Sequence, residues 1–154
     1  MLFRSLKLVM TEQGSAWVPD TLARLDSLHD RMVNGRIGEL GVPEDAVLKM
    51  RPSEYFRRNV FLGASCMPRR EAELRHAIGL ENIMWGTDYP HPEGSWPQTR
   101  SQMRDTFAGL PEAEIAAMLG GNAARVYGFD VEKLAPLAAR IGPERRLFRA
   151  GETA

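Results

Sequence analysis

The sequence predicts an α/β fold built on a parallel β-sheet, and three observations support this class. First, three apolar runs have the length of strands, namely Leu6–Met10, Asn59–Ala64 and Asn82–Gly86. Second, these runs are almost continuously apolar instead of alternating, which is typical of strands that are covered on both faces. Third, segments with helical spacing separate the runs, and this order of elements favours βαβ units with right-handed crossovers.

The first helix is predicted over residues 19–33. Pro19 is suited to the first helical turn, where the missing N–H would have had no partner inside the helix. Leu22, Leu25 and Leu28 then recur at the spacing of one helix face. This segment is therefore expected to be an amphipathic helix that packs against the sheet.

The bounds of the later helices are predicted from glycines that can end a helix and from the spacing of apolar residues. Gly79 and Gly128 are each placed to end a helix. The pair Gly120-Gly121 is also interpreted as a helix stop, in preference to a phosphate cradle, because it follows a helix and not a strand. The connection over residues 34–58 is polar, with a short helical turn in "SEYFRR". The remaining predicted helices span residues 68–79, 96–108, 111–119, 122–128 and 130–141, and an extended or frayed end covers residues 146–154.

Composition narrows the class of protein. The chain has 154 residues, enough to bury a core, and 44% of them are hydrophobic. Twenty basic and twenty acidic side chains balance, so nothing favours a nucleic acid as partner. No apolar stretch approaches the roughly 18 residues of a membrane span, and the first residues do not resemble a signal peptide. A single cysteine, Cys66, excludes a disulfide framework within the chain. We therefore expect a soluble, cytoplasmic protein with an enzyme-like composition.

Three strands are few for a sheet of this kind. A parallel sheet of three strands has two open edges, and the first predicted strand begins only a few residues after Met1. We therefore expect residues 1–154 to form one partial domain, the C-terminal part of a larger α/β domain. Either the missing N-terminal half or a further copy in a homo-oligomer would complete the sheet.

Functional groups of a parallel α/β sheet gather at the C-terminal ends of its strands. Glu12 follows the first strand, Cys66 the second, and Asp88 the third, with His91 shortly after it. Strand alternation places Asp88 on the face of Met84 and Gly86, opposite Ile83 and Trp85, and it places Glu12 on the face of Leu6, Leu8 and Met10.

Each of these residues also has an ordinary structural interpretation. An aspartate after a strand often caps the next helix or orders a turn, and a glutamate at a strand end often forms an ion pair. Cys66 is interpreted as a small buried hydrophobic residue. His29 and His76 lie in helices, far from the strand ends, and are interpreted as structural. For His91 the sequence leaves open a loop residue between prolines and a residue of the site.

Three phrases together, "LKLVMTEQGSAWVPDTLARLD", "NIMWGTDYPHPEGSWP" and "LGGNAARVYG", resemble the amidohydrolase-related family. This family comprises metal-dependent (β/α)8-barrel enzymes, including decarboxylases related to aminocarboxymuconate semialdehyde decarboxylase. The resemblance implies that residues 4–130 are barrel strands six to eight with their helices, and that residues 131–154 are a C-terminal helix and tail. It implies that Asp88 is the aspartate at the end of strand eight, which binds the metal or transfers a proton.

Two features depart from the family pattern. The chain has no counterpart of the histidine motif on the first barrel strand, and it lacks the histidine of the middle strand. Many relatives carry a histidine at the end of strand six, where this chain has Glu12. A divalent metal, zinc or similar, is therefore expected in the parent enzyme but not in this chain alone, because a catalytic zinc needs about three protein ligands.

The resulting hypothesis is a fragment of a hydrolase or carboxy-lyase that acts on a small molecule and is inactive alone. Asp88 would be the metal ligand or proton shuttle, His91 would support it or contact the substrate, and Glu12 would be a polar group at the mouth. Trp17, Tyr89 and Trp96 would be the walls of the substrate pocket. The alternatives are a truncated, non-catalytic assembly module and, third, a free-standing domain that binds a small ligand.

Overall fold

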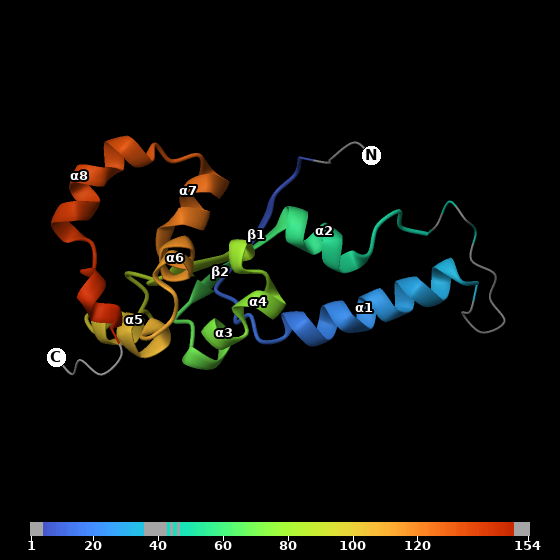
Figure 1. Ribbon diagram of the computed structural model, residues 1–154, viewed down its shortest axis with the longest axis horizontal. Helices are drawn as coiled ribbons and strands as arrows, with labels where there is room; N and C mark the ends of the chain where they lie inside the picture. The colour runs from blue at the N-terminus through green and yellow to red at the C-terminus, as the bar shows by residue number, and fades with distance from the viewer. Residues whose placement is uncertain (1–4, 36–42, 44, 46, 150–154) are drawn as a thin grey trace.

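A three-stranded parallel sheet lies at the centre of the computed structural model, which describes residues 5–35, 43, 45 and 47–149 (Figure 1). The strands are β1 (Leu8–Thr11), β2 (Val60–Ser65) and β3 (Ile83–Gly86), in the order β1-β2-β3. Both pairs are parallel, and Met10, Leu62 and Ile83 lie in register across the sheet. The structure therefore confirms the predicted parallel α/β sheet.

The two faces of the sheet differ as the sequence predicts for β3. Leu62, Ala64 and Ile83 belong to the hydrophobic core, and Trp85 packs against that core from the same face. Met84 points to the opposite face and is also buried. The helix-facing side of the sheet is thus the side that carries the bulk of the core.

Helices surround the sheet and leave the edges of β1 and β3 without a partner strand among the described residues (Figure 1). Their bounds are α1 Val18–Val33, α2 Pro52–Asn59, α3 Arg69–Glu73, α4 Arg75–Ile78, α5 Thr99–Phe107, α6 Glu112–Ala116, α7 Asn122–Tyr127 and α8 Val131–Ile141. Short 3₁₀ helices, η2 Leu80–Asn82 and η4 Arg145–Phe148, and one π-helical segment, η3 Ala117–Gly121, complete the described elements.

The helices before β3 agree with the sequence in place but differ in detail. The helical turn predicted in "SEYFRR" is an eight-residue helix, α2. The single helix predicted over residues 68–79 is two short helices, because Leu74 leaves the helical conformation with ψ of 0°. Gly79 ends the second helix with φ of 116°, a value that favours glycine, as predicted. Part of the predicted connection, residues 36–42, 44 and 46, lies outside the described residues.

The interpretation of Gly120-Gly121 as a helix stop is wrong. Gly121 has helical dihedral angles, φ of −59° and ψ of −43°, and the chain runs from α6 through η3 into α7. The π-helical turn η3 joins α6 to α7 without a break in the helix. Glycine permits a helix to end but does not force it to end. The helix instead ends at Gly128, where φ of 71° is the left-handed stop that the sequence predicts.

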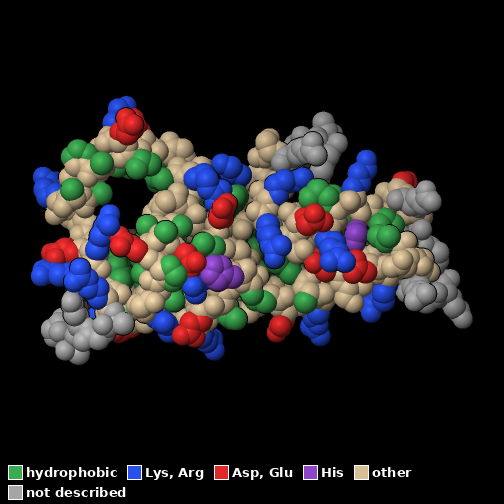
Figure 2. All heavy atoms as spheres, in the orientation of Figure 1, with side chains coloured by type: hydrophobic (Ala, Val, Ile, Leu, Met, Phe, Trp, Pro, Cys, Tyr) green, Lys and Arg blue, Asp and Glu red, His purple; other side chains and the backbone are tan. Residues whose placement is uncertain are grey.

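The segment after α7 arches away from the body of the protein. No residue of α8 is buried, and an opening rimmed by hydrophobic side chains separates it from the body (Figure 2). The predicted extended end is wrong for η4, which forms a 3₁₀ helix. Leu147 and Phe148 pack against the core there, and this burial favours an ordered turn. Residues 150–154 of the predicted end lie outside the described residues.

Two buried asparagines fix the start of β3. The side-chain amide of Asn122 donates to the carbonyl oxygens of Leu80 and Ile83, both at 2.8 Å. Asn82 donates to the carbonyl oxygens of Arg57 at 2.9 Å and Val60 at 2.7 Å. These bonds satisfy backbone acceptors where strands begin, and they position β3 and its C-terminal end relative to α7 and β2.

In the part of the chain that the structure describes, no helix combines the length and the apolar character needed to cross a bilayer.

Candidate active site

A rare backbone conformation recurs at the C-terminal ends of all three strands. Glu12, Cys66 and Asp88 have φ of 55°, 51° and 57°, and they are the only described residues other than glycine with positive φ. Such a conformation costs on the order of 1–3 kcal/mol and concentrates at functional sites. Since the C-terminal ends of parallel strands meet at one edge, these residues mark that edge as the candidate site.

Asp88 is paired with His91 at this edge. Nδ1 of His91 lies 3.0 Å from Oδ2 of Asp88, so the imidazole N–H donates to the carboxylate. The Asp88 side chain is 17% exposed and that of His91 is 54% exposed. The hydrogen bond to Asp88 raises the pKa of His91, burial opposes this rise, and the charges of Asp88, Glu93 and Glu12 add to it. The carboxylates around His91 therefore favour the protonated form of its imidazole.

The loop that holds Asp88 is closed by backbone hydrogen bonds. The N–H of His91 donates to the carbonyl of Asp88 at 2.8 Å, and the N–H of Gly94 donates to the carbonyl of His91 at 2.9 Å. The N–H of Ser95 donates to the carbonyl of Thr87 at 2.8 Å. A Cβ on Gly94 would lie 2.9 Å from the carbonyl oxygens of Thr87, Asp88 and His91, so only glycine fits there.

Cys66 also lies in this group; the sequence places it after the second strand but gives it no role in the site. Its Sγ lies 3.5 Å from the carbonyl oxygen of Glu93, and its N–H donates to the carbonyl of Gly86 at 3.4 Å. Burial raises the pKa of the Cys66 thiol, and the charge of Asp88 raises it further. Cys66 is only partly buried, which corrects its interpretation as a buried hydrophobic residue. The signal was its position directly after the middle strand.

Alternation does not carry over from the strands to Glu12 and Asp88. Glu12 directly follows Thr11, the last residue of β1, and Asp88 lies two residues after Gly86, the last residue of β3; both residues are left-handed. A left-handed residue turns the chain out of the strand path, so side-chain direction no longer alternates. The predicted placement of Glu12 with Leu8 and Met10, and of Asp88 with Met84, stays a prediction, because the strands end before both residues.

The three predicted aromatic walls fall into two places. Tyr89 and Trp96 contact each other edge to face, with ring centroids 6.1 Å apart, and together with Thr87 and Thr99 they line a shallow depression. Trp17 instead packs edge-on against Phe56 of α2, with ring centroids 6.4 Å apart, and its Nε1 donates to the carbonyl of Gly14. Tyr89 directly follows Asp88 in the chain, and the ring contact brings Trp96 next to Tyr89. A substrate role for all three stays a prediction.

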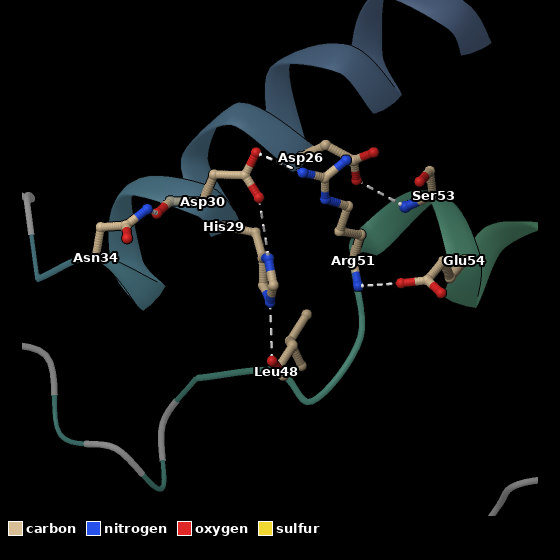
Figure 3. A network of polar contacts seen from close by, with 8 residues as sticks. All are labelled: Asp26, His29, Asp30, Asn34, Leu48, Arg51, Ser53 and Glu54. Atoms are coloured by element: carbon tan, nitrogen blue, oxygen red, sulfur yellow. Dashed lines mark hydrogen bonds and ion pairs between the residues drawn. The ribbon is translucent and has the colours of Figure 1, made fainter.

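The other two histidines have structural contacts. Nε2 of His29 lies 2.8 Å from the carbonyl oxygen of Leu48, and Nδ1 lies 3.8 Å from Asp30 (Figure 3). His29 thus ties the later part of α1 to the segment before α2. Nε2 of His76 lies 3.4 Å from Oε1 of Glu114. These contacts agree with the structural interpretation of both residues.

The described residues do not form a metal centre by themselves. Among residues 5–35, 43, 45 and 47–149, no group of three His, Cys, Asp or Glu side chains is arranged to hold a metal ion. A catalytic zinc site needs about three protein ligands. Asp88 and Glu12 are carboxylates at the correct edge of the sheet, but this donor set is incomplete for such an ion.

Comparison with known proteins identifies the family. The profile of a family described as "Amidohydrolase" matches residues 2–129, which is most of the chain. This chain belongs to the amidohydrolase family. Amidohydrolases generally use divalent metals. The matched region ends just before α8, which begins at Val131.

A solved structure agrees with this assignment. The chain resembles the crystal structure of an amidohydrolase from Mycobacterium avium subsp. paratuberculosis K-10, with a TM-score of 0.58 and 25% sequence identity. The likeness covers 79% of this chain and 28% of that one, so the chain spans well under half of its structural neighbour. No curated protein matches the chain significantly. The three parallel strands with their helices are thus part of a (β/α)8 barrel, as predicted.

Proposed function

We propose that this chain supplies the C-terminal strands of an amidohydrolase-type barrel that acts on a small carboxylated or amide-containing molecule. The single observation that carries the proposal is Asp88, held left-handed after β3 and bonded to His91, beside the equivalent strand-end residues Glu12 and Cys66. Membership of the amidohydrolase family supports a hydrolase as the parent enzyme. The family that the phrase around Asp88 resembles includes decarboxylases related to aminocarboxymuconate semialdehyde decarboxylase, so the proposed reaction is hydrolysis or decarboxylation.

The chemistry that these residues can perform is proton transfer and orientation. Asp88 is a carboxylate that can accept a proton from water or substrate, or bind a cation through oxygen. The imidazole Nδ1–H of His91 fixes the orientation of that carboxylate through the 3.0 Å hydrogen bond to Oδ2 of Asp88. Glu12 adds negative charge at the mouth, and Tyr89 and Trp96 offer aromatic surface to a small substrate. No step is assigned to a metal, because the described donor set is incomplete.

The proposal predicts that the isolated chain is inactive. A barrel site needs groups from strands that this chain does not contain, and three strands leave one side of the candidate site without walls. We would assay the purified chain, and a chimera in which residues 8–129 replace the corresponding part of the M. avium amidohydrolase, on a panel of small amides and carboxylic acids. Turnover by the chimera but not by the isolated chain supports the proposal, whereas turnover by the isolated chain contradicts it.

An assembly module is the second candidate, and one observation favours it. Leu6 and Leu8 at the open β1 edge are 61% and 53% exposed, and they border an apolar depression that includes Leu25, Leu48 and Phe56. An exposed apolar edge strand is a template for pairing with another chain. Sedimentation analysis distinguishes the two: a stable oligomer together with an inactive chimera favours the assembly module, and a monomer contradicts it.

A further inference from the structure

Glu71 is a buried carboxylate that the proposed function does not use. It lies on α3 and is 3% exposed, and one of its oxygens, Oε2, accepts two hydrogen bonds from Ser15. The backbone N–H of Ser15 donates at 2.8 Å and its hydroxyl at 2.6 Å. Ser15 itself is fully buried. Among the described residues, no Lys, Arg or His forms an ion pair with Glu71.

The partner of Glu71 lies in the loop that begins with Glu12. Ser15 closes this loop just before α1, and α3 follows β2 and Cys66. Gly14 also approaches Glu71 closely, because a Cβ at Gly14 would lie 3.1 Å from Oε1. Two residues 56 positions apart are thereby joined across the candidate edge. The bond connects the loop after β1 to the first turn of the helix after β2 (Figure 1).

Burying the Glu71 carboxylate costs free energy, so its contact with Ser15 calls for an explanation. A carboxylate buried without a cation loses its hydration, and two hydrogen bonds return only part of that free energy. The loop it holds contains the left-handed Glu12, whose conformation needs surrounding contacts to persist. Within the described residues, Glu12 itself has no hydrogen bond or ion pair that fixes its side chain. The loop contacts therefore determine where the backbone of Glu12 lies, and with it the region that its side chain can reach.

We infer that Glu71 is a positioning residue, which holds Glu12 at the mouth of the candidate active site through its two hydrogen bonds to Ser15. The inference rests on the proposed function, because the position of Glu12 matters only if this edge is catalytic. Glu71 touches no reacting group. It acts through the β1–α1 loop, which would otherwise be free to leave the edge where Asp88 and Cys66 lie.

The test compares the 154-residue chain with its Glu71→Leu and Glu71→Gln variants by NMR. A residue with positive φ gives a strong intraresidue NOE between its amide and α protons, so Glu12 and Asp88 each report their own backbone conformation. Leucine fills the space without an acceptor, while the amide oxygen of glutamine can accept both Ser15 bonds. We expect Glu71→Leu to lose the strong NOE at Glu12 and keep it at Asp88, and Glu71→Gln to keep both.

The outcomes separate positioning from general stability. A folded Glu71→Leu chain that keeps the strong NOE at Glu12, or loses it at both residues, overturns the inference. If Glu71→Leu does not fold, Ser15→Ala is judged by the same criteria, because it removes one of the two bonds and little volume. None of these signals depends on turnover. An inactive chimera would contradict the proposed function and leave this result intact.

Discussion

The Asp88 loop shows how a single residue sets the geometry of the candidate site. Asp88, His91 and Thr87 turn their carbonyl oxygens toward the same point, and Gly94 occupies that point without a side chain. The loop can therefore close over its own backbone and present the Asp88 carboxylate to His91. Glycine is needed here for close approach, and not for a positive φ.

Replacing Gly94 with alanine should open this loop. The new Cβ would meet three carbonyl oxygens at 2.9 Å, a contact that real Cβ atoms essentially never make. We expect Gly94→Ala to lower the free energy of unfolding by about 1–3 kcal/mol, as overpacking does. Gly86→Ala is the matched control, since a Cβ there meets nothing within 4 Å. Equal unfolding midpoints in urea for the two variants would show that the loop is not packed as described.

Asp26 should make stability depend on pH. Burial opposes its charged form, but hydrogen bonds from Ser53 and the charge of Arg51 outweigh burial and hold its pKa below the ordinary 3.8 (Figure 3). A depressed pKa stabilises the fold above the ordinary value, and this stabilisation is lost as pH falls through the folded-state pKa. The unfolding free energy of wild type relative to Asp26→Asn should thus be constant near neutral pH and shrink toward pH 3, as measured in urea. A difference that grows as pH falls would refute this.

At the scale of elements, α7 positions β3 through one side chain. Asn122 is buried, and its amide donates to Leu80 and Ile83 on either side of the start of β3. This explains why the phrase "GNAARVYG" combines a helix with an asparagine at its first position. The N-terminal end of β3 is therefore tied to the helix that follows η3, and the strand carries this constraint to its C-terminal end at Asp88.

Loss of the Asn122 amide should destabilise the protein. Asn122→Ala leaves two buried carbonyl oxygens without a donor, which costs on the order of 1–3 kcal/mol. Asn34→Ala is the control, because its side chain makes one bond, to the carbonyl of Asp30, in an exposed position. Thermal unfolding should show a clearly lower midpoint for Asn122→Ala than for Asn34→Ala. The opposite order would mean that the Asn122 bonds contribute little.

The elements also show what sequence reasoning can and cannot predict. All three strands were predicted to within two residues, because buried parallel strands leave continuous apolar runs. Gly79 and Gly128 end helices, yet Gly120-Gly121 does not, since glycine permits a left-handed stop that tertiary contacts then select or refuse. The strand ends indicated Asp88 and Glu12. Their left-handed backbone, and the Glu71–Ser15 contact, depend on long-range packing that spacing does not encode.

At the scale of the whole molecule, the chain is an open part of a barrel. Its three strands have two unpaired edges among the described residues, and it spans 28% of the amidohydrolase structure that it resembles. Its polar strand ends lie at one edge, as in a complete (β/α)8 barrel, but the residues that the structure describes there provide too few ligands for a metal site. The fold and the family agree that a site would lie at this edge, and we propose that its chemistry depends on Asp88.

The most direct test is the turnover number of the barrel chimera with Asp88→Asn, compared with Asp105→Asn as the matched control. Asp105 lies on α5, and its side chain is 71% exposed. Loss of a group that transfers protons or binds the metal lowers turnover by about 100-fold or more. We predict such a drop for Asp88→Asn, with the fold intact by circular dichroism, and near-unchanged turnover for Asp105→Asn. Equal turnover in the two variants would contradict the assignment of Asp88 to the active site.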